Sequence, residues 1–164
     1  MTKVQKRRRR ENKTDYHKRL KLLKSEKPRM VFRRTNRYIT AQYVISQEAQ
    51  DKVIFGINSK DLLKYGWPKT AEGSLKSVTA SYLTGYFAGK KIIKEKLETP
   101  IIDLGMIRVL HKTKVFGFIK GIIDSGLNIE SSKNEAFPEK ERISGEHLKN
   151  KIPFKEIKSK IDKL

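Results

Sequence analysis

The polar residues between positions 33 and 42 are the side chains of this sequence best suited to contact a nucleic acid. They combine cations, which contact phosphates, with amides and hydroxyls, which reach bases and ribose hydroxyls. The set is Arg33, Arg34, Asn36, Arg37, Tyr38, Thr40 and Gln42. It predicts an RNA-binding surface; the alternative is a basic sheet face turned to solvent.

Apolar and polar residues alternate on both sides of Thr35-Asn36, which predicts two antiparallel strands joined by a two-residue loop at these positions. Every cross-strand pair in that register agrees in character. The pairs are Phe32 with Ile39 and Met30 with Ala41 on one face, and Arg33 with Tyr38, Val31 with Thr40 and Arg29 with Gln42 on the other. One face should therefore pack inward, while the other is basic and polar.

A cationic arm precedes this hairpin. Residues 1–37 hold sixteen of the 38 Lys and Arg residues but three of the 18 acids, a net +13 of the total +20. Because the run from Lys6 to Arg10 lacks apolar periodicity, we expect it to be disordered until it meets a polyanion. The alternative is a solvated tail or localisation signal. The candidate contacts in the arm are Lys6, Arg7, Arg8, Arg9, Arg10, Lys13, Arg19, Lys21 and Lys24.

A second basic segment follows Gly105, near the expected start of a helix at Thr113. Arg108, Lys112 and Lys114 lie there, where the positive end of a helix dipole would add to their charge. This segment predicts a further phosphate contact, with an ordinary basic loop as the equal alternative.

Residues suited to catalysis or metal binding are sparse. The three histidines are far apart, and the chain has no cysteine, which removes thiolate metal sites and disulfides. Asp61, Asp103 and Asp124 could form a metal-dependent nuclease centre, but we interpret Asp103 as a strand-end carboxylate that caps a turn. We therefore expect no enzyme, no cofactor and no small-molecule substrate. A general basic RNA chaperone is a further alternative.

The hydrophobic pattern supplies the elements that would position these residues. We expect strands at 29–33, 38–42, 53–57 and 101–104, and helices at 15–24, 74 or 77–97 and 113–125. Thr14 should cap the first helix, whose stripe of Tyr16, Leu20 and Leu23 would dock. Helical signals begin at Asn58-Ser59, and segments 138–149 and 154–164 resemble weakly amphipathic helices that need a partner surface.

The order β-β-β-α-β-α predicts an α/β fold: a mixed sheet with an antiparallel hairpin, packed by two main helices in a two-layer sandwich. We expect an arm with a short helix at 1–27, an RNA-binding core at 28–130 and a helical extension at 131–164. No apolar run approaches the ~20 residues of a membrane-spanning helix, and no secretory signal is expected.

Several blocks of the sequence, in a fixed order, resemble the archaeal and eukaryotic type of the large-subunit ribosomal protein that binds 5S rRNA, family eighteen of the large subunit. The resemblance covers residues 5 to about 148. The blocks are KRRRRENKTDYHKRLKLLKSEKPRMVFRRTNRYITAQ at 6–42, KYGW at 64–67, SYLTGYFAGKK at 81–91, IIDLG at 101–105, KVFGFIKGIIDSGL at 114–127 and SGEHL at 144–148.

This resemblance implies a cytoplasmic, non-enzymatic scaffold that binds 5S rRNA and helps attach it to the large-subunit rRNA in the central protuberance. It also implies a neighbouring 5S-binding ribosomal protein as a partner. The contacts that it favours are Arg7–Arg10, Lys13, Tyr16, Arg19, Arg29, Arg33, Asn36 and Gln42.

Overall fold

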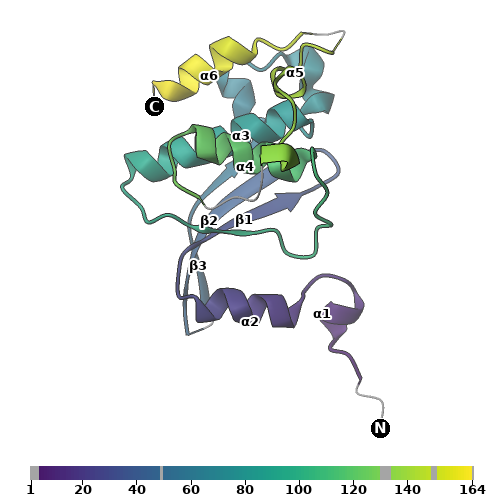
Figure 1. Cartoon of the computed structure of the whole chain (residues 1–164), viewed down its shortest axis with the longest axis vertical. Helices are drawn as coiled ribbons and strands as arrows, with labels where there is room; N and C mark the ends of the chain where they lie inside the picture. The colour runs from purple at the N-terminus through teal and green to yellow at the C-terminus, as the bar shows by residue number, and fades with distance from the viewer. Residues whose placement is uncertain (1–3, 49, 130–133, 149–150, 164) are drawn as a thin grey trace.

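The computed structural model of the chain describes residues 4–48, 50–129, 134–148 and 151–163 (Figure 1). A sheet and the helices packed on one of its faces form a two-layer body. The helices α3 (Val78–Lys94) and α4 (Lys114–Asp124) lie above the sheet in Figure 1, and the N-terminal α1 (Arg7–Arg10) and α2 (Tyr16–Lys24) lie below. No helix of the described segments has the length and apolar character needed to cross a membrane.

The sheet contains β1 (Arg29–Arg34), β2 (Ile39–Gln47), β3 (Gln50–Asn58) and β4 (Ile101–Asp103) in the order β3-β2-β1-β4. The β1 strand is antiparallel to β2 and parallel to β4. This confirms the predicted α/β fold with a mixed sheet. The chain crosses from β3 to β4 through α3, so that β1 becomes a central strand and β4 an edge.

The hairpin register differs from the predicted one by two residues. Phe32 pairs with Ala41, and Arg33 pairs with Thr40. The loop is Asn36-Arg37 rather than Thr35-Asn36, because the Thr35 hydroxyl accepts a hydrogen bond from the Tyr38 N–H at 2.9 Å and closes the turn. A shift of two residues keeps every side chain on its predicted face.

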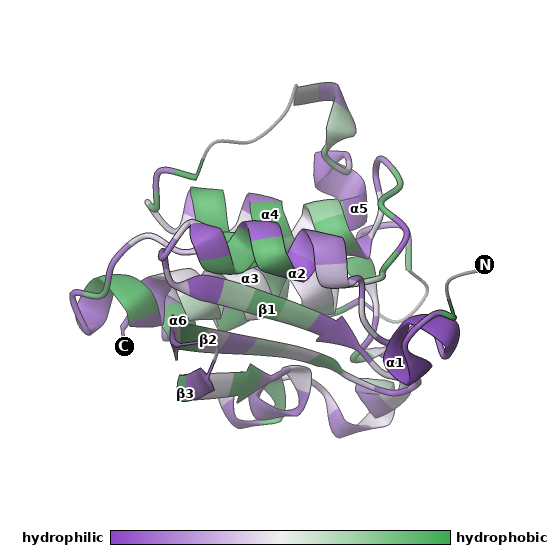
Figure 2. Ribbon diagram, turned by 90° about the horizontal axis from the view of Figure 1, so that it is seen from below, coloured by the Kyte–Doolittle hydropathy of each residue, from purple (hydrophilic) through white to green (hydrophobic). Residues whose placement is uncertain are grey.

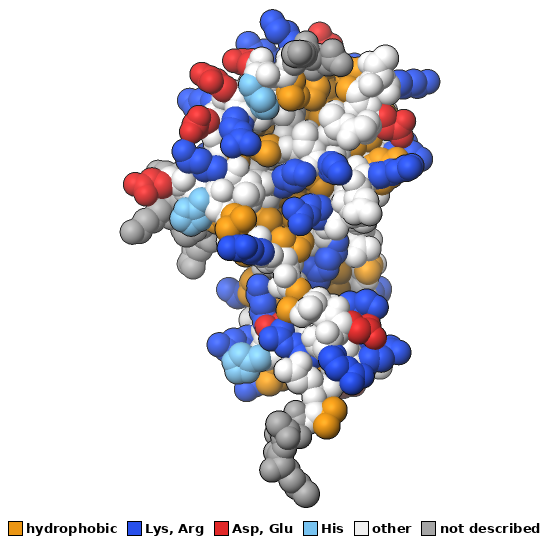
Figure 3. All heavy atoms as spheres, turned by 90° about the vertical axis from the view of Figure 1, so that its right-hand side faces the viewer, with side chains coloured by type: hydrophobic (Ala, Val, Ile, Leu, Met, Phe, Trp, Pro, Cys, Tyr) orange, Lys and Arg blue, Asp and Glu red, His pale blue; other side chains and the backbone are white. Residues whose placement is uncertain are grey.

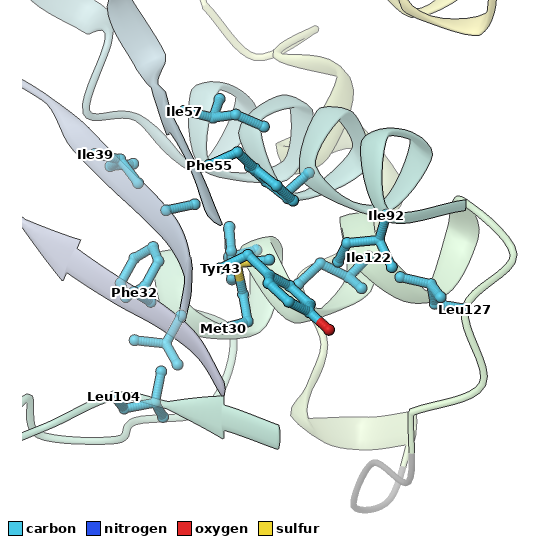
Figure 4. Packing of buried hydrophobic residues seen from close by; sticks show 14 residues of the cluster. Met30, Phe32, Ile39, Tyr43, Phe55, Ile57, Ile92, Leu104, Ile122 and Leu127 are labelled. Carbon is cyan, nitrogen blue, oxygen red and sulfur yellow. The ribbon is translucent and has the colours of Figure 1, made fainter. Parts of the chain in front are cut away.

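The main core fills the space between the sheet and the helices α3 and α4. Side chains from β1, β2 and β3 point toward those from the helices (Figure 4). Its buried members include Met30, Phe32, Ile39, Tyr43, Phe55, Ile57, Ile92, Phe118 and Ile122. The two helices approach closely because glycines lie at their contact: a Cβ added to Gly121 would overlap the carbonyl oxygen of Tyr82.

A second core packs the C-terminal part onto the outer side of α3. It joins η1 (Ser59–Tyr65), η2 (Lys69–Ser74), α5 (Lys140–Ser144) and α6 (Phe154–Asp162) to the body of the protein. The short η3 (Asn134–Ala136) lies outside this cluster, and its Ala136 carbonyl accepts a hydrogen bond from the Lys112 N–H. Ile157 and Ile161 of α6 are fully buried in the same cluster as Trp67. The partner surface that the C-terminal helices were predicted to need is therefore α3 and η1.

A polar contact also fastens α6. The Tyr86 hydroxyl donates a hydrogen bond to Asp162, and the Lys90 ammonium lies 2.9 Å from the same carboxylate. Partial burial by itself would raise the pKa of Asp162, but the hydrogen bonds from Tyr86 and Lys90 lower it below its ordinary value.

The N-terminal segment departs from the sequence prediction in two ways. Arg7–Arg10 forms one turn of helix rather than a disordered run, and the Lys13 and Thr14 N–H groups donate to the Arg8 carbonyl. Asp15, not Thr14, caps α2. The α2 stripe is also not the docking side, since Tyr16 and Leu20 are 37% and 52% exposed.

Candidate nucleic-acid interface

One face of the sheet is covered by α3 and α4, and the opposite face is only partly covered by α2. Toward the hairpin end, this opposite face carries Arg33 from β1, Thr40 and Gln42 from β2 and Gly56 from β3. Gly56 pairs with Gln42 and presents no side chain. The result is a surface where an exposed cation lies beside a half-buried hydroxyl and a half-buried amide. We call these four residues the open face.

The helix α2 borders the open face through polar contacts at both of its sides. Arg19 Nη2 lies 3.1 Å from Asp51 Oδ2 on β3, and Lys18 Nζ donates to the Gly105 carbonyl at 3.3 Å, just beyond β4. Leu22 is half-buried. These contacts leave Lys21 and Lys24 exposed, so α2 presents cations beside the open face.

Arg29 is buried, so the expectation that it lies on the accessible polar face is wrong. Its side chain is 2% exposed, and its Nη1 donates to Asp103 Oδ2 at 3.0 Å. Its Nη2 contacts Asp51 Oδ1 at 2.7 Å and Ser46 Oγ at 2.9 Å. The guanidinium therefore ties β1 to β3 and β4, and through Asp51 it also reaches Arg19. We call Arg19, Arg29, Asp51 and Asp103 the Arg29 network.

Asp51 titrates below its ordinary range. Burial by itself would raise its pKa, but hydrogen bonds from Ser46, Arg19 and Arg29 outweigh burial and lower it. The carboxylate is therefore charged near neutral pH, where it holds the two arginines.

Asp103 caps a turn, as interpreted from the sequence. Its Oδ1 accepts a hydrogen bond from the Gly105 N–H at 2.8 Å. Asp61 accepts from the Asn58 N–H and completes the capping box at the start of η1, and Asp124 accepts from the Tyr82 hydroxyl. The three carboxylates each have a local partner, and the described residues contain no group of three or more acids, histidines or cysteines arranged for a metal ion.

Arg33 is an accessible cation that the structure holds in one orientation. Its side chain is 46% exposed, although its Nη1 donates to the carbonyls of Phe32 and Asp103 at 2.8 and 3.1 Å. These bonds hold the guanidinium in one orientation without covering it. A pre-oriented arginine loses less side-chain entropy when it binds a phosphate.

Further cations lie at the hairpin end of the domain. Arg34, Asn36 and Arg37 are exposed there. Burial, together with the nearby charges of Arg34 and Lys76, lowers the pKa of Lys114. Lys76 was missing from the sequence prediction, and the parallel packing of α3 on α4 brings it to this end.

Two other predicted contacts, Tyr38 and Lys112, are less free than the sequence suggested. Tyr38 is half-buried against the second core, and its hydroxyl donates to Glu72 at 3.2 Å. Lys112 forms an ion pair with Glu139 at 2.9 Å, whereas Arg108 in the same loop is exposed. Tyr16 is exposed, with the Lys6 ammonium 4.7 Å from the centre of its ring.

The cations of the arm form one surface with those of the domain. Arg7, Arg8 and Arg10 are exposed, and α1 is hydrophilic throughout (Figure 2). Lys13 is exposed but lies 2.8 Å from Glu11. In Figure 3, Lys and Arg side chains extend from the N-terminal segment to the middle of the domain on one side of the molecule. Such a distribution favours a polyanionic partner.

The fold and this surface define a basic α/β protein with a cationic arm and an accessible sheet face. Residues 2–101 match the family described as ribosomal large subunit proteins 60S L5 and 50S L18. The chain is 44% identical over 146 residues to the large ribosomal subunit protein uL18 of Korarchaeum cryptofilum, covering 89% of this chain and 72% of that protein.

Two further relatives carry the same name. The uL18 of Methanothermobacter thermautotrophicus is 38% identical, covering 87% of this chain and 71% of the relative. That of Methanococcoides burtonii is 40% identical, covering 89% of this chain and 82% of the relative. The chain belongs to this family of large-subunit ribosomal proteins. Membership places it in the cytoplasmic ribosome and indicates a structural, non-catalytic role.

Proposed function

We propose that this protein binds 5S rRNA and helps attach it to the large-subunit rRNA in the central protuberance, beside another 5S-binding ribosomal protein. The observation that carries the proposal is the open face, where Arg33, Thr40 and Gln42 are accessible beside the cations of α2. A preformed cation, hydroxyl and amide together fit a phosphate backbone with 2′-hydroxyls.

The surface divides into a part that supplies charge and a part that supplies selectivity. Arg7, Arg8 and Arg10 are exposed on a single turn of helix, so they contact phosphates in any sequence. Gln42 and Asn36 carry amides that hydrogen-bond base edges, and Gln42 is positioned by the sheet. Discrimination between RNAs therefore depends on the sheet and the hairpin loop more than on the arm.

The test compares binding of 5S rRNA and tRNA to the full-length protein across salt concentrations. If about six phosphates are contacted, affinity for 5S rRNA falls on the order of a thousandfold between roughly 50 and 200 mM salt. Arg7→Gln/Arg10→Gln should weaken binding of both RNAs and make the salt dependence shallower. Gln42→Ala should instead bring the two affinities closer together.

The outcome decides between the proposed function and its alternatives. Equal affinity of the wild-type protein for 5S rRNA and tRNA would favour a general RNA chaperone. Cleavage of 5S rRNA in the presence of magnesium that disappears in Asp103→Asn would favour a nuclease. Salt-insensitive binding would contradict the phosphate contacts themselves.

A further inference from the structure

A groove on the partly covered side of the sheet lies away from the open face, between α2 and the end of the β2–β3 hairpin. In Figure 1 this hairpin end reaches the C-terminal end of α2. The groove measures about 1100 Å³. Its lining residues are Leu23, Glu26, Ile45, Ser46, Gln47, Glu48, Gln50, Asp51, Lys52 and Ile54.

The groove exposes apolar side chains that the described part of the chain does not cover. Ile54 is 38% exposed, and Leu23 and Ile45 are half-buried, Ile45 being packed in part against the main core. The strand β3 pairs with β2 alone among the described strands, so its other edge offers free backbone groups. An apolar hollow beside an unpaired strand edge suits an extended polypeptide segment.

The charge around the groove differs from that of the rest of the protein. Three acids, Glu26, Glu48 and Asp51, and one cation, Lys52, are among the residues that line the groove, whereas the whole chain has a net charge of +20. Glu26 and Glu48 line the groove and are exposed, and neither has an ion-pair partner among the described residues. Carboxylates at these positions repel a phosphate backbone and attract cations.

We infer that this groove docks an extended, lysine- or arginine-rich segment of a neighbouring protein in the large subunit. Apolar side chains of the segment contact Ile45 and Ile54, and its cations pair with Glu26 and Glu48. The hairpin end is thus a protein-binding surface on a molecule that otherwise favours RNA. The inference rests on the ribosomal setting and not on the identity of the bound RNA.

The first test uses the full-length protein and a short fluorescein-labelled peptide of alternating lysine and valine, followed by fluorescence anisotropy. The net charge of +20 disfavours non-specific binding of such a peptide, so we expect saturable binding at the groove. Glu26→Gln/Glu48→Gln should weaken it roughly two- to thirtyfold, as expected from the loss of two surface ion pairs. Glu98→Gln/Glu135→Gln removes equal charge from exposed residues outside the groove and should leave binding unchanged.

Ile54→Lys, a change at a partly exposed position, should abolish binding of the peptide while the protein stays folded by circular dichroism. Absence of saturable binding to the wild-type protein, or equal binding to the Glu26→Gln/Glu48→Gln variant, would overturn the inference. The affinity of the Glu26→Gln/Glu48→Gln variant for 5S rRNA should not fall.

The second test places a photo-crosslinking amino acid at Ile54 and, separately, at Thr40 in assembled large subunits. Ile54 should crosslink to a lysine- or arginine-rich protein segment. A crosslink from Ile54 to rRNA, or none at all, would refute the protein-docking inference. Thr40 on the open face should crosslink to rRNA, and its failure would count against the proposed RNA surface alone.

Discussion

Replacing Arg29 with Met should destabilise the protein strongly, because it removes the centre of the Arg29 network. The change leaves the Asp103 carboxylate, whose side chain is 8% exposed, without its closest cation. Breaking a buried ion pair from one side costs about 3–5 kcal/mol. Arg33 Nη2 stays 3.6 Å from Asp103, and Arg19 stays at Asp51, so compensation is partial. We therefore expect a loss of about 3 kcal/mol, at the lower end of that range.

The measurement is urea unfolding followed by the fluorescence of Trp67, the single tryptophan of the chain, which is buried in the second core. In thermal unfolding, a loss of about 3 kcal/mol corresponds to a midpoint lowered by roughly 6–12 °C for a domain of this size. Both measurements report on the whole domain, since the two cores share α3.

A second substitution separates the uncompensated charge from the lost packing. Asn at position 103 keeps an acceptor for the Gly105 N–H but carries no charge. Arg29→Met/Asp103→Asn should therefore be more stable than Arg29→Met alone, even though the double variant has lost both charges of the ion pair. If Arg29→Met costs less than about 1 kcal/mol, or if adding Asp103→Asn makes the protein still less stable, the reasoning about the buried charge is refuted.

Three further outcomes follow from packing and titration. Gly121→Ala should destabilise by at least about 2 kcal/mol because its Cβ meets the α3 backbone, whereas Gly73→Ala, with open space around it, should be nearly neutral in urea unfolding. The pKa of Asp51 is lower in the folded protein than its unfolded value of 3.8. The charged carboxylate therefore stabilises the fold above pH 3.8, and this stabilisation is lost as the pH falls through the folded-state pKa. In Asp51→Asn, the free energy of unfolding should therefore decrease less at acidic pH. The pKa of Asp162 is also lowered in the folded protein, so acid should weaken the attachment of α6 in the same way. Asp162→Asn should reduce the increase in amide hydrogen exchange of α6 at acidic pH, and an unchanged increase would contradict the role of Asp162 in holding α6.

The local pattern of side chains was enough to predict the two strands of the hairpin and their faces. Alternation in β1 and β2 placed Phe32 inward and Arg33 outward, and this assignment holds although the register shifted by two residues. A shift of two preserves the faces, so hydrophobic periodicity cannot distinguish the two registers. The Thr35 hydroxyl that closes the turn decided between them, through a contact that periodicity does not encode.

The burial of Arg29 and its ion pairs could not be predicted from the local sequence. Arg29 alternates with apolar residues like any outward-facing cation, but Asp51 and Asp103 come from strands far away in the sequence. Only the sheet order β3-β2-β1-β4 brings both carboxylates to one guanidinium. The side of α2 that faces the sheet depends on Asp51 as well, because Arg19 contacts Asp51 while the apolar Leu20 remains exposed.

The sequence by itself determined the charge, the polyanionic class of partner and the two-layer α/β fold, because composition and periodicity express these directly. The tertiary structure decided which cations are accessible. It buried Arg29, oriented Arg33 and brought Lys76 near Lys114. It also gathered Glu26 and Glu48 around one groove. Which side chains are exposed, and which charged groups come together, depends on contacts between distant segments, and these contacts exist only once the chain has folded.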